Sequence, residues 1–317
     1  MARKQRTFLE QELLRIKNAQ RGISIDKMMI SPEKKEILEK IGLIALDLDK
    51  TLLTSAGLTE NSKECLEEAI RRGYQVVVAT GRPFSALPAG VFDINGLDYV
   101  ICSNGAHIID LSTGYYLYSD YLSEEASIWC RDRLKTLGYH IEVFSGGKAY
   151  TDKERYEKCR NGVGVIEGAA YVLRTRIPVD DIWEVWNSHL SEIENINIIF
   201  EDQEDKKRVW EELKSCESIG FTVTSSTSYN LEIGGENTSK ANALSQLSSI
   251  SGIPLERVMS FGDSPNDMAM IMESGFGVAV DNALPEVKEV SDYVTTSNED
   301  EGVAKAIRLL LFKEDTI

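Results

Sequence analysis

The stretch that decides the fold of this 317-residue chain is Ile41-Gly42-Leu43-Ile44-Ala45-Leu46-Asp47-Leu48-Asp49-Lys50-Thr51-Leu52-Leu53. Its first six residues form an apolar run typical of a buried parallel strand, and ligands bind at the carboxyl ends of such strands in open α/β sheets. Asp47 and Asp49 follow directly, and two carboxylates so placed repel each other unless a cation or a proton lies between them. Mg²⁺ with oxygen ligands meets that requirement. A solvated turn with capping Asp and Thr is the plainer explanation of an isolated Asp-x-Asp.

Composition narrows the class of protein. The length exceeds what one compact core usually takes, so we expect two domains. A net charge of −16 argues against a general nucleic-acid binder, although a local cluster of metal and Lys still admits a small anionic substrate. Five dispersed cysteines without a CxxC pair indicate reduced thiols in a cytoplasmic protein. No apolar run is long enough to span a membrane and no signal-peptide pattern is present, so neither membrane insertion nor secretion is expected.

The first 40 residues differ from the rest. They hold ten Lys and Arg against six Asp and Glu. Leu9, Leu13 and Ile16 recur at helical spacing and predict an amphipathic helix over about residues 8–20. We therefore expect residues 1–40 to be an N-terminal helical extension. A packing or oligomerisation role, or a frayed end, is the plainer interpretation, and a contact for an acidic partner or a membrane surface is the functional one.

From Ile41 onward the pattern predicts an α/β fold. Strands expected at 41–46, 75–79 and 99–102 alternate with helices, which is typical of a doubly wound, Rossmann-like parallel sheet. We expect core-domain segments at 41–114 and 236–317, the second with strands at 258–261 and 293–294. Residues 115–235 mix amphipathic strands (140–144, 171–176, 196–201) with helices near 124–137, 181–193 and 205–217. They predict an inserted α+β domain that covers the carboxyl edge of the sheet.

Chemistry-bearing residues gather at the expected carboxyl ends of the strands. They are Asp47 with Asp49, Thr80, Lys240, and Asp263 with Asp267. Each alone is weak evidence, since a Thr after a strand usually caps a helix and Gly-Asp-Ser-Pro is usually a turn. Together they supply what phosphoryl transfer requires: a carboxylate nucleophile, a metal, hydroxyl and amide donors for phosphate oxygens, and a cation.

Four ordered motifs resemble the haloacid dehalogenase superfamily: residues 47–52, Thr80-Gly81-Arg82, Ser239-Lys240 and residues 262–267. Their spacing is similar to that of the Cof-type phosphatases, in which a C2B cap lies between the second and third motifs. Residues 103–106, 231–233, 277–283 and 302–305 match as well. The resemblance covers about residues 41–312. The chain departs at Lys50, where the family usually has Gly, and at residues 241–243, where it often has Gly-x-Ala; neither departure removes a catalytic group.

The resemblance implies a role for each site residue. Asp47 is expected to attack phosphorus and form an aspartyl-phosphate, and Asp49 to protonate the leaving alkoxide and then activate water. The Mg²⁺ ligands implied are the Asp47 carboxylate, the Asp49 main-chain carbonyl and Asp263, with Asp267 orienting metal-bound water. The residues implied to contact phosphate or substrate are Thr80, Gly81, Lys240 and Asn266, with Asn104 at the rim. For Arg82, a substrate contact and a structural ion pair are both open.

The leading hypothesis is a phosphatase acting on a small organic phosphate, with sugar phosphates the commonest substrates of similar proteins. Flavin mononucleotide and pyridoxal phosphate stay open as substrates. The rival enzyme is a phosphomutase of the phosphomannomutase type, which needs a basic cap to hold a second phosphate. The predicted cap is acidic, which favours hydrolysis, with Glu192, Glu194, Glu201, Asp202, Glu204 and Asp205 close together. A non-catalytic binding module on the same fold is the third hypothesis, and loss of Asp47 or Asp263 would have favoured it. The sequence does not indicate the oligomeric state or the inward-facing cap residues.

Overall fold

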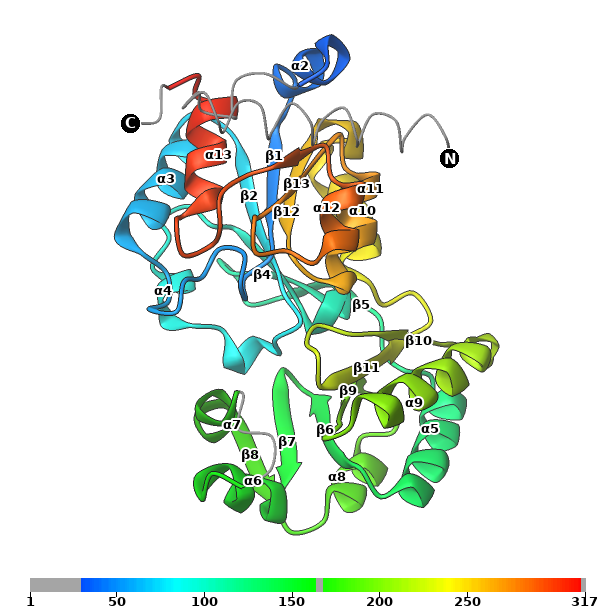
Figure 1. The fold of residues 1–317 in the computed structure, drawn as a ribbon. Helices are drawn as coiled ribbons and strands as arrows, with labels where there is room; N and C mark the ends of the chain where they lie inside the picture. Colours follow the sequence, from blue (N-terminus) through cyan, green and yellow to red (C-terminus); the bar gives the residue numbers. More distant parts are fainter. Residues whose placement is uncertain (1–29, 164–167, 315–317) are drawn as a thin grey trace.

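The computed structural model describes residues 30–163 and 168–314, so the helix predicted over residues 8–20 lies outside the described part. The described chain forms two sheets with their helices, which lie one above the other in Figure 1. The upper body, here called the core, contains an eight-stranded sheet, and the lower body, here called the cap, contains a six-stranded sheet. No helix of the described residues has the length and apolar character needed to cross a membrane.

The core sheet has the strand order β14-β13-β12-β1-β2-β3-β4-β5. Its strands are β1 (Leu43–Leu46), β2 (Gln75–Ala79), β3 (Tyr99–Cys102), β4 (His107–Asp110), β5 (Tyr116–Ser119), β12 (Val258–Gly262), β13 (Phe276–Ala279) and β14 (Tyr293–Val294). The first six strands in this order are parallel, which confirms the doubly wound prediction. β4 and β5 extend the sheet in antiparallel pairing, which the sequence did not predict.

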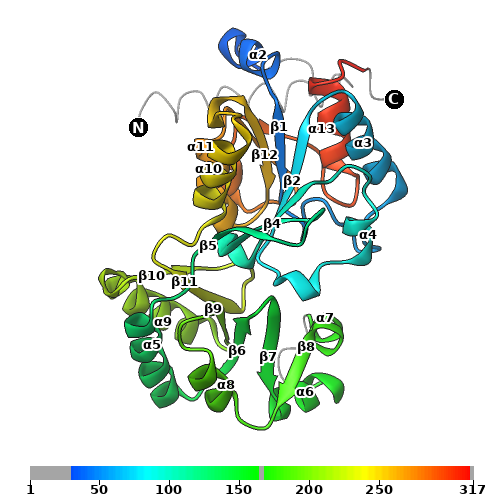
Figure 2. The same ribbon diagram turned by 180° about the vertical axis from the view of Figure 1, so that it is seen from behind.

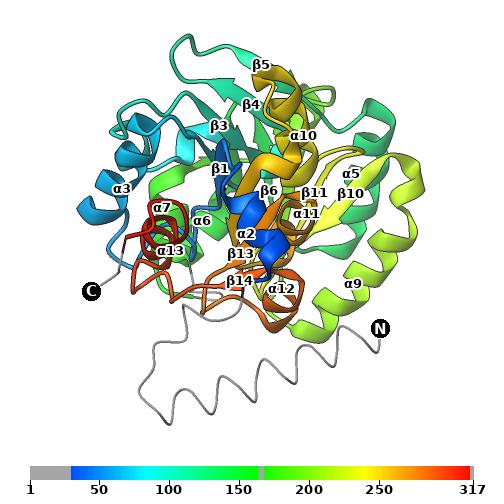
Figure 3. The same cartoon turned by 90° about the horizontal axis from the view of Figure 1, so that it is seen from above.

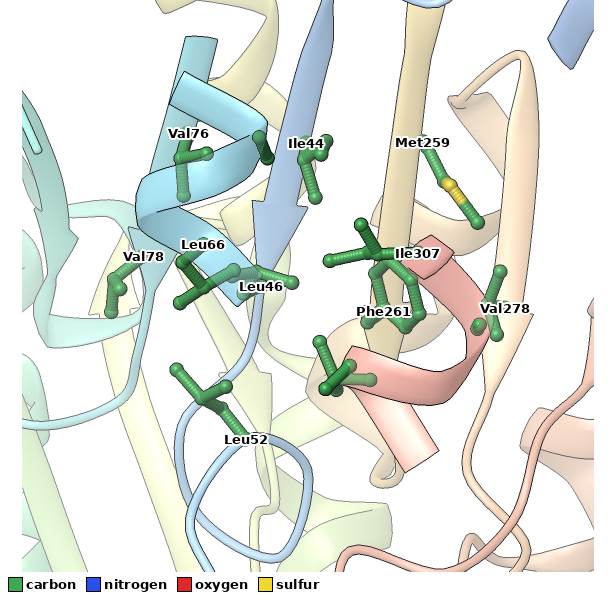
Figure 4. Packing of buried hydrophobic residues seen from close by; sticks show 14 of the residues in the cluster. Ile44, Leu46, Leu52, Leu66, Val76, Val78, Met259, Phe261, Val278 and Ile307 are labelled. Carbon is green, nitrogen blue, oxygen red and sulfur yellow. The ribbon is translucent and has the colours of Figure 1, made fainter. Parts of the chain in front are cut away.

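Helices cover both faces of the core sheet. They are α3 (Glu60–Arg71), α4 (Ala89–Phe92), α10 (Lys240–Ser251), α11 (Met268–Glu273), α12 (Pro285–Val290) and α13 (Gly302–Leu310). A further helix, α2 (Pro32–Leu38), lies beyond the amino end of β1 (Figure 1). Successive residues of a strand point to opposite faces, so Ile44 and Leu46 of β1 pack with α3 and α13 while Leu43 and Ala45 pack with α10. Figure 4 shows Ile44 and Leu46 among Leu66 and Ile307, and Figure 3 shows α10 on the opposite side of β1 from α3 and α13.

The cap sheet has the order β10-β11-β9-β6-β7-β8 and is antiparallel except between β7 and β8. Its elements are β6 (His140–Ser145), β7 (Lys148–Asp152), β8 (Arg176–Val179), β9 (Ile193–Ile199), β10 (Phe221–Thr224), β11 (Asn230–Gly235), α5 (Glu124–Leu137), α6 (Lys153–Arg160), α7 (Ala169–Thr175), α8 (Ile182–Ser188) and α9 (Gln203–Ser215). Val143, Ile196 and Ile233 point to one face, where they pack with Trp186 and the apolar sides of α5, α8 and α9 (Figure 2).

Two predictions about local structure were wrong. The strand expected at 171–176 is the helix α7, because Ala169 and Val172 recur at helical spacing and pack on Cys159 of α6. The insertion was expected to begin at residue 115, but residues 116–119 form β5, which pairs with β4 of the core sheet. By strand pairing, the chain therefore leaves the core after Ser119; the other domain boundaries stay predictions.

The two chain crossings between core and cap lie side by side. Asp120 follows β5 on the way into the cap, and its carboxylate accepts hydrogen bonds from Asn237 N at 3.1 Å and Thr238 Oγ1 at 2.6 Å on the way back. A Cβ atom on Gly235 would lie 2.7 Å from the same carboxylate, so glycine permits this close approach. The two crossings are thereby fastened to each other.

Candidate active site

The sequence-predicted residues meet at one edge of the core sheet. Asp47 follows β1, Thr80 follows β2, Asn104 lies in the turn after β3, and Asp263 follows β12, while Lys240 is the first residue of α10. These strands are parallel neighbours, so their carboxyl ends share one edge. The topology therefore explains why residues nearly 220 positions apart in sequence are side by side.

A buried lysine connects two of the carboxylates. Lys240 Nζ donates to Asp47 Oδ1 at 2.5 Å and to Asp267 Oδ1 at 2.7 Å, and all three residues are buried. The other oxygen of Asp267 accepts the backbone amides of Asp263 and Ser264, both at 3.0 Å. Asp267 therefore holds both Lys240 and the loop that carries Asp263.

Asp263 is itself oriented by two hydroxyls. Thr51 Oγ1 donates to its Oδ1 at 3.0 Å, and Ser264 Oγ donates to its Oδ2 at 2.8 Å. This role of Thr51 was not predicted from the sequence, although the residue belongs to the stretch that decides the fold. Hydroxyls that donate to a carboxylate fix its direction, which is the usual arrangement around a metal-binding carboxylate.

The cluster carries more negative charge than its lysine balances. Oxygen atoms of Asp47, Asp263 and Asp267 lie within 4.8 Å of one another in a metal-compatible arrangement, and all three residues are buried. Burial raises the pKa of Asp47 well above its ordinary value, against the lowering effect of Lys240. Burial, with the charge of Asp267, raises the pKa of Asp263 to about 6. A divalent cation fits this donor set, because it compensates the charge that one lysine leaves unbalanced.

Asp49 lies outside that cluster and pairs with Arg82. The guanidinium donates to both carboxylate oxygens, at 2.8 Å from Nε and 2.5 Å from Nη2. Arg82 also donates to the Ala86 carbonyl and lies 4.6 Å from the ring centroid of Tyr171 in the cap. Of the two alternatives for Arg82, the structure forms the ion pair, and a substrate contact stays a prediction. The Asp49 side chain keeps 55% of its surface exposed, so it is available to a substrate.

Thr80, Asn104 and Asn266 form a polar rim beside the cluster. Thr80 Oγ1 accepts from Arg82 N at 3.1 Å, and Thr80 O accepts from Asn104 N at 3.0 Å. Asn266 Nδ2 donates to Asn104 Oδ1 at 2.9 Å. A Cβ atom on Gly81 would lie 3.0 Å from the same Oδ1, so a side chain at residue 81 would crowd the rim.

Lys50 occupies a left-handed backbone conformation, with φ at 62°. Glycine adopts this conformation without steric cost, which explains why a glycine is usual there in similar proteins. Asn282 Nδ2 donates to the Lys50 carbonyl at 2.7 Å and helps to hold the turn. The departure from glycine is therefore tolerated without displacing Asp49 or Thr51.

The face of the cap sheet opposite α5, α8 and α9 is polar and buried. Glu142, Asn197 and Glu232 are register partners across β6, β9 and β11, and all three are buried. Arg176 Nη2 pairs with Glu142 at 2.7 Å. Burial raises the pKa of Glu232, and Ser226, Asn104 and Lys240 oppose that rise. Strand β9 of this sheet contacts residues 103–105 of the core, so the sheet lies against the core site. Buried polar atoms on the polar face that have no protein partner are Glu142 Oε1, Thr151 Oγ1, Asn195 Oδ1 and Glu232 Oε2.

The acidity of the cap, which favoured hydrolysis, lies mostly on its outer surface. Of the six acidic residues concerned, four are exposed and Asp205 is half-buried; only Glu194 is buried. The buried polar part of the cap contains two arginines, Arg155 and Arg176. The acidity of this segment belongs mainly to its outer surface, and it therefore does not distinguish a phosphatase from a phosphomutase.

Comparisons with known proteins agree with this geometry. The family model for haloacid dehalogenase-like hydrolases matches residues 44–307. Phosphatase YwpJ of Bacillus subtilis is 31% identical over 288 residues, which cover 85% of this chain and 99% of the relative. The 5-amino-6-(5-phospho-D-ribitylamino)uracil phosphatase YwtE of the same organism is 30% identical, with coverage of 84% and 97%. A solved structure of a haloacid dehalogenase-like hydrolase from B. subtilis superposes with a TM-score of 0.74 at 29% identity, over 85% of this chain and 99% of the other.

Proposed function

Because this chain belongs to the haloacid dehalogenase-like hydrolases and its relatives are phosphatases, we propose that it hydrolyses a sugar or polyol phosphate through an aspartyl-phosphate on Asp47. The observation that carries the proposal is the contact of Lys240 with one oxygen of Asp47 in a buried carboxylate cluster. That contact directs the Asp47 carboxylate and supplies positive charge where a phosphoryl group gains electron density.

The proposed reaction has two steps. First, Asp47 Oδ2 attacks phosphorus, the ester P–O bond breaks, and Asp49 gives its proton to the leaving alkoxide. Next, Asp49 takes a proton from water, the water oxygen attacks phosphorus, and the Asp47–phosphorus bond breaks to release phosphate. Arg82 keeps Asp49 pointed at the leaving group until substrate enters, and Thr80, the Gly81 amide and Asn266 hold phosphate oxygens.

We assign Mg²⁺ as the metal, held by the Asp47 and Asp263 carboxylates and the Asp49 main-chain carbonyl. Asp267 accepts hydrogen bonds from the Lys240 ammonium and from the backbone amides of Asp263 and Ser264. Because it binds the groups that carry the site, we give it a supporting role rather than direct ligation. When bound, the ion would neutralise phosphate charge and keep Asp47 ionised in a buried environment that otherwise raises its pKa.

The polar face of the cap supports a polyhydroxylated leaving group. Glu142 and Arg176 neutralise each other, and the face further offers amides, hydroxyls and carboxylate oxygens that have no protein partner. Such groups match the several hydroxyls of a sugar or a sugar alcohol. YwtE, whose name specifies a phosphoribitylamino compound, is in keeping with this class. The five cysteines are all free thiols, and we propose a reducing, cytoplasmic setting for the protein.

The test is phosphate release from a panel of sugar, polyol and cofactor phosphates, with and without Mg²⁺. Conversion of glucose 1-phosphate to glucose 6-phosphate is followed in parallel. We expect metal-dependent release, and a loss of at least about a thousandfold in Asp47→Asn with the fold retained. Isomerisation without release would favour the phosphomutase, and Arg155 would then be its candidate phosphate ligand. A wild-type protein inactive in both assays would favour the binding module.

A further inference from the structure

Glu194 is a fully buried carboxylate that the proposed reaction does not use. It lies in β9 of the cap, but it has partners in both bodies. Ser103 Oγ of the core donates to its Oε2 at 2.7 Å, and the Gly147 amide of the cap donates to its Oε1 at 2.5 Å. His107 Nε2 of the core lies 3.3 Å from Oε1. Burying a charge requires such partners. Ser103 and His107 belong to the core, so Glu194 has them only while cap and core are together.

Its core partner belongs to a strained turn. Ser103 and Asn104 have φ angles of 50° and 57°, although neither residue is glycine, and both are buried. Such backbone persists only where its surroundings hold it in place. The turn is held from the core side by two hydrogen bonds, from Ser103 N to Arg82 O at 2.9 Å and from Asn104 N to Thr80 O at 3.0 Å. Glu194 holds the same turn from the cap side.

The turn touches the remaining phosphate-handling groups. Asn104 Oδ1 accepts from Asn266, and the next residue, Gly105, packs so tightly that a Cβ atom there would lie 2.2 Å from the Ser239 carbonyl oxygen. Ser239 immediately precedes Lys240. A displacement of the turn would therefore disturb both the polar rim and the start of α10.

A second contact ties the same part of the cap to the core. Gly147 lies at the tip of the β6–β7 hairpin, and its carbonyl accepts from Ser85 N of the core at 2.8 Å. Ser85 follows Arg82 by three residues, so the hairpin tip rests on the segment that positions Asp49. Glu194 is bonded to this hairpin through the Gly147 amide and to the turn through Ser103.

We propose that Glu194 is a positioning residue that couples closure of the cap to assembly of the phosphate site. Its carboxylate fixes Ser103, and Ser103 fixes the left-handed turn that presents Asn104. The proposal rests on the proposed function only in taking this edge of the core sheet to be the phosphate site.

The test uses the full-length Ser103→Ala and Glu194→Gln variants, their double mutant, and Ser127→Ala as a matched control. Ser127 is also a fully buried serine with one side-chain hydrogen bond, but it lies among the cap helices, where its hydroxyl accepts from Trp186 Nε1 at 2.9 Å. Ser103→Ala removes the contact to Glu194, and Glu194→Gln replaces a charge-assisted hydrogen bond with a neutral one.

Binding of inorganic phosphate in the presence of Mg²⁺ is measured by calorimetry, alongside kcat/KM and thermal unfolding. We expect Ser103→Ala and Glu194→Gln each to weaken phosphate binding about tenfold, as loss of one hydrogen bond to a charged group predicts, and the double mutant to lose little more than either single variant. Ser127→Ala should lower only the unfolding temperature.

Phosphate binding that is unchanged in both variants would overturn the proposal, as would losses that multiply in the double mutant. Because calorimetry needs no turnover, a wild-type protein that binds phosphate but hydrolyses no ester would contradict the proposed function and leave the Glu194 test intact.

Discussion

Lys240→Met is the substitution that probes the charge balance of the site most directly. Methionine has a similar length, so the change removes a cation while leaving little empty volume. Lys240 is fully buried and contacts Asp47 and Asp267 at 2.5 and 2.7 Å. Loss of one partner from a buried ion pair costs about 3–5 kcal/mol, and here two carboxylates lose their cation together. We expect a loss of about 4–5 kcal/mol of unfolding free energy near neutral pH without metal, at the upper end of that range.

The loss should depend on pH in a defined direction. Lys240 lowers the pKa of Asp47, whose burial already raises that pKa above the ordinary value of 3.8, so removing the lysine raises it further. A carboxyl group whose pKa is raised by folding lowers the free energy of unfolding by its full amount at pH values above its pKa in the native state. At pH values below its pKa in the unfolded chain, this loss of stability disappears. The difference between Lys240→Met and wild type should therefore be largest at pH 7.5 and smaller at pH 5.

Urea unfolding followed by circular dichroism, in the presence of EDTA at both pH values, measures these differences. Lys153→Met is the matched control, because Lys153 forms an exposed ion pair with Asp180 and its loss should cost less than about 1 kcal/mol. The reasoning is refuted if Lys240→Met costs no more than the control, or if its cost is the same at both pH values.

Three further outcomes are expected. Arg82→Gln should lower kcat about tenfold to a hundredfold for alkyl phosphates, because Asp49 loses its orientation, and much less for p-nitrophenyl phosphate, whose leaving group needs no acid; an equal loss for both esters would contradict that role. Gly105→Ala should cost more than about 3 kcal/mol in urea unfolding, since its Cβ would lie 2.2 Å from the Ser239 carbonyl oxygen. Gly114→Ala, with a comparable positive φ but open space, should cost only about 1–2 kcal/mol, and similar costs for the two would be evidence against the close packing. Mg²⁺ at 100 times its dissociation constant should stabilise the wild type by about 2.7 kcal/mol relative to EDTA, and an unmoved thermal transition would contradict the metal site.

The edge of the core sheet could be predicted because its signals are local. Each apolar run is followed directly by polar residues, and parallel pairing brings the carboxyl ends of the strands together. The placement of Asp47, Thr80 and Asp263 at one edge could therefore be predicted without knowing any long-range contact. The edge strands β4 and β5 were missed because β5 is mostly exposed and carries no alternation of apolar and polar residues.

The cap was predicted less well, because its polar residues depend on partners far away in sequence. Residues 171–176 contain two β-branched residues and an aromatic one, which favoured a strand, but the segment is helical and packs on Cys159. Glu194 was counted with the exposed acidic residues around it. The one sequence signal that Glu194 is buried is its position in the run 193–198, where isoleucines border polar residues. Its partners Ser103 and Gly147 lie in other segments of the chain, so the sequence around Glu194 does not reveal them.

The hydrogen bonds between Asp120 and residues 237–238 have a consequence for how the substrate specificity of such a protein can change in evolution. The cap enters and leaves the core at a single tied point. An exchange of residues between the crossings therefore leaves β1 and β12, which precede Asp47 and Asp263, and α10, which begins with Lys240, in place. Evolution or protein engineering can therefore replace the cap between Asp120 and Thr238. Such a replacement would change the specificity for the leaving alcohol and would keep the catalytic residues of the core. A grafted cap must supply a residue that bonds Ser103 as Glu194 does. By the proposed role of Glu194, a cap without such a residue would leave the phosphate site incompletely assembled.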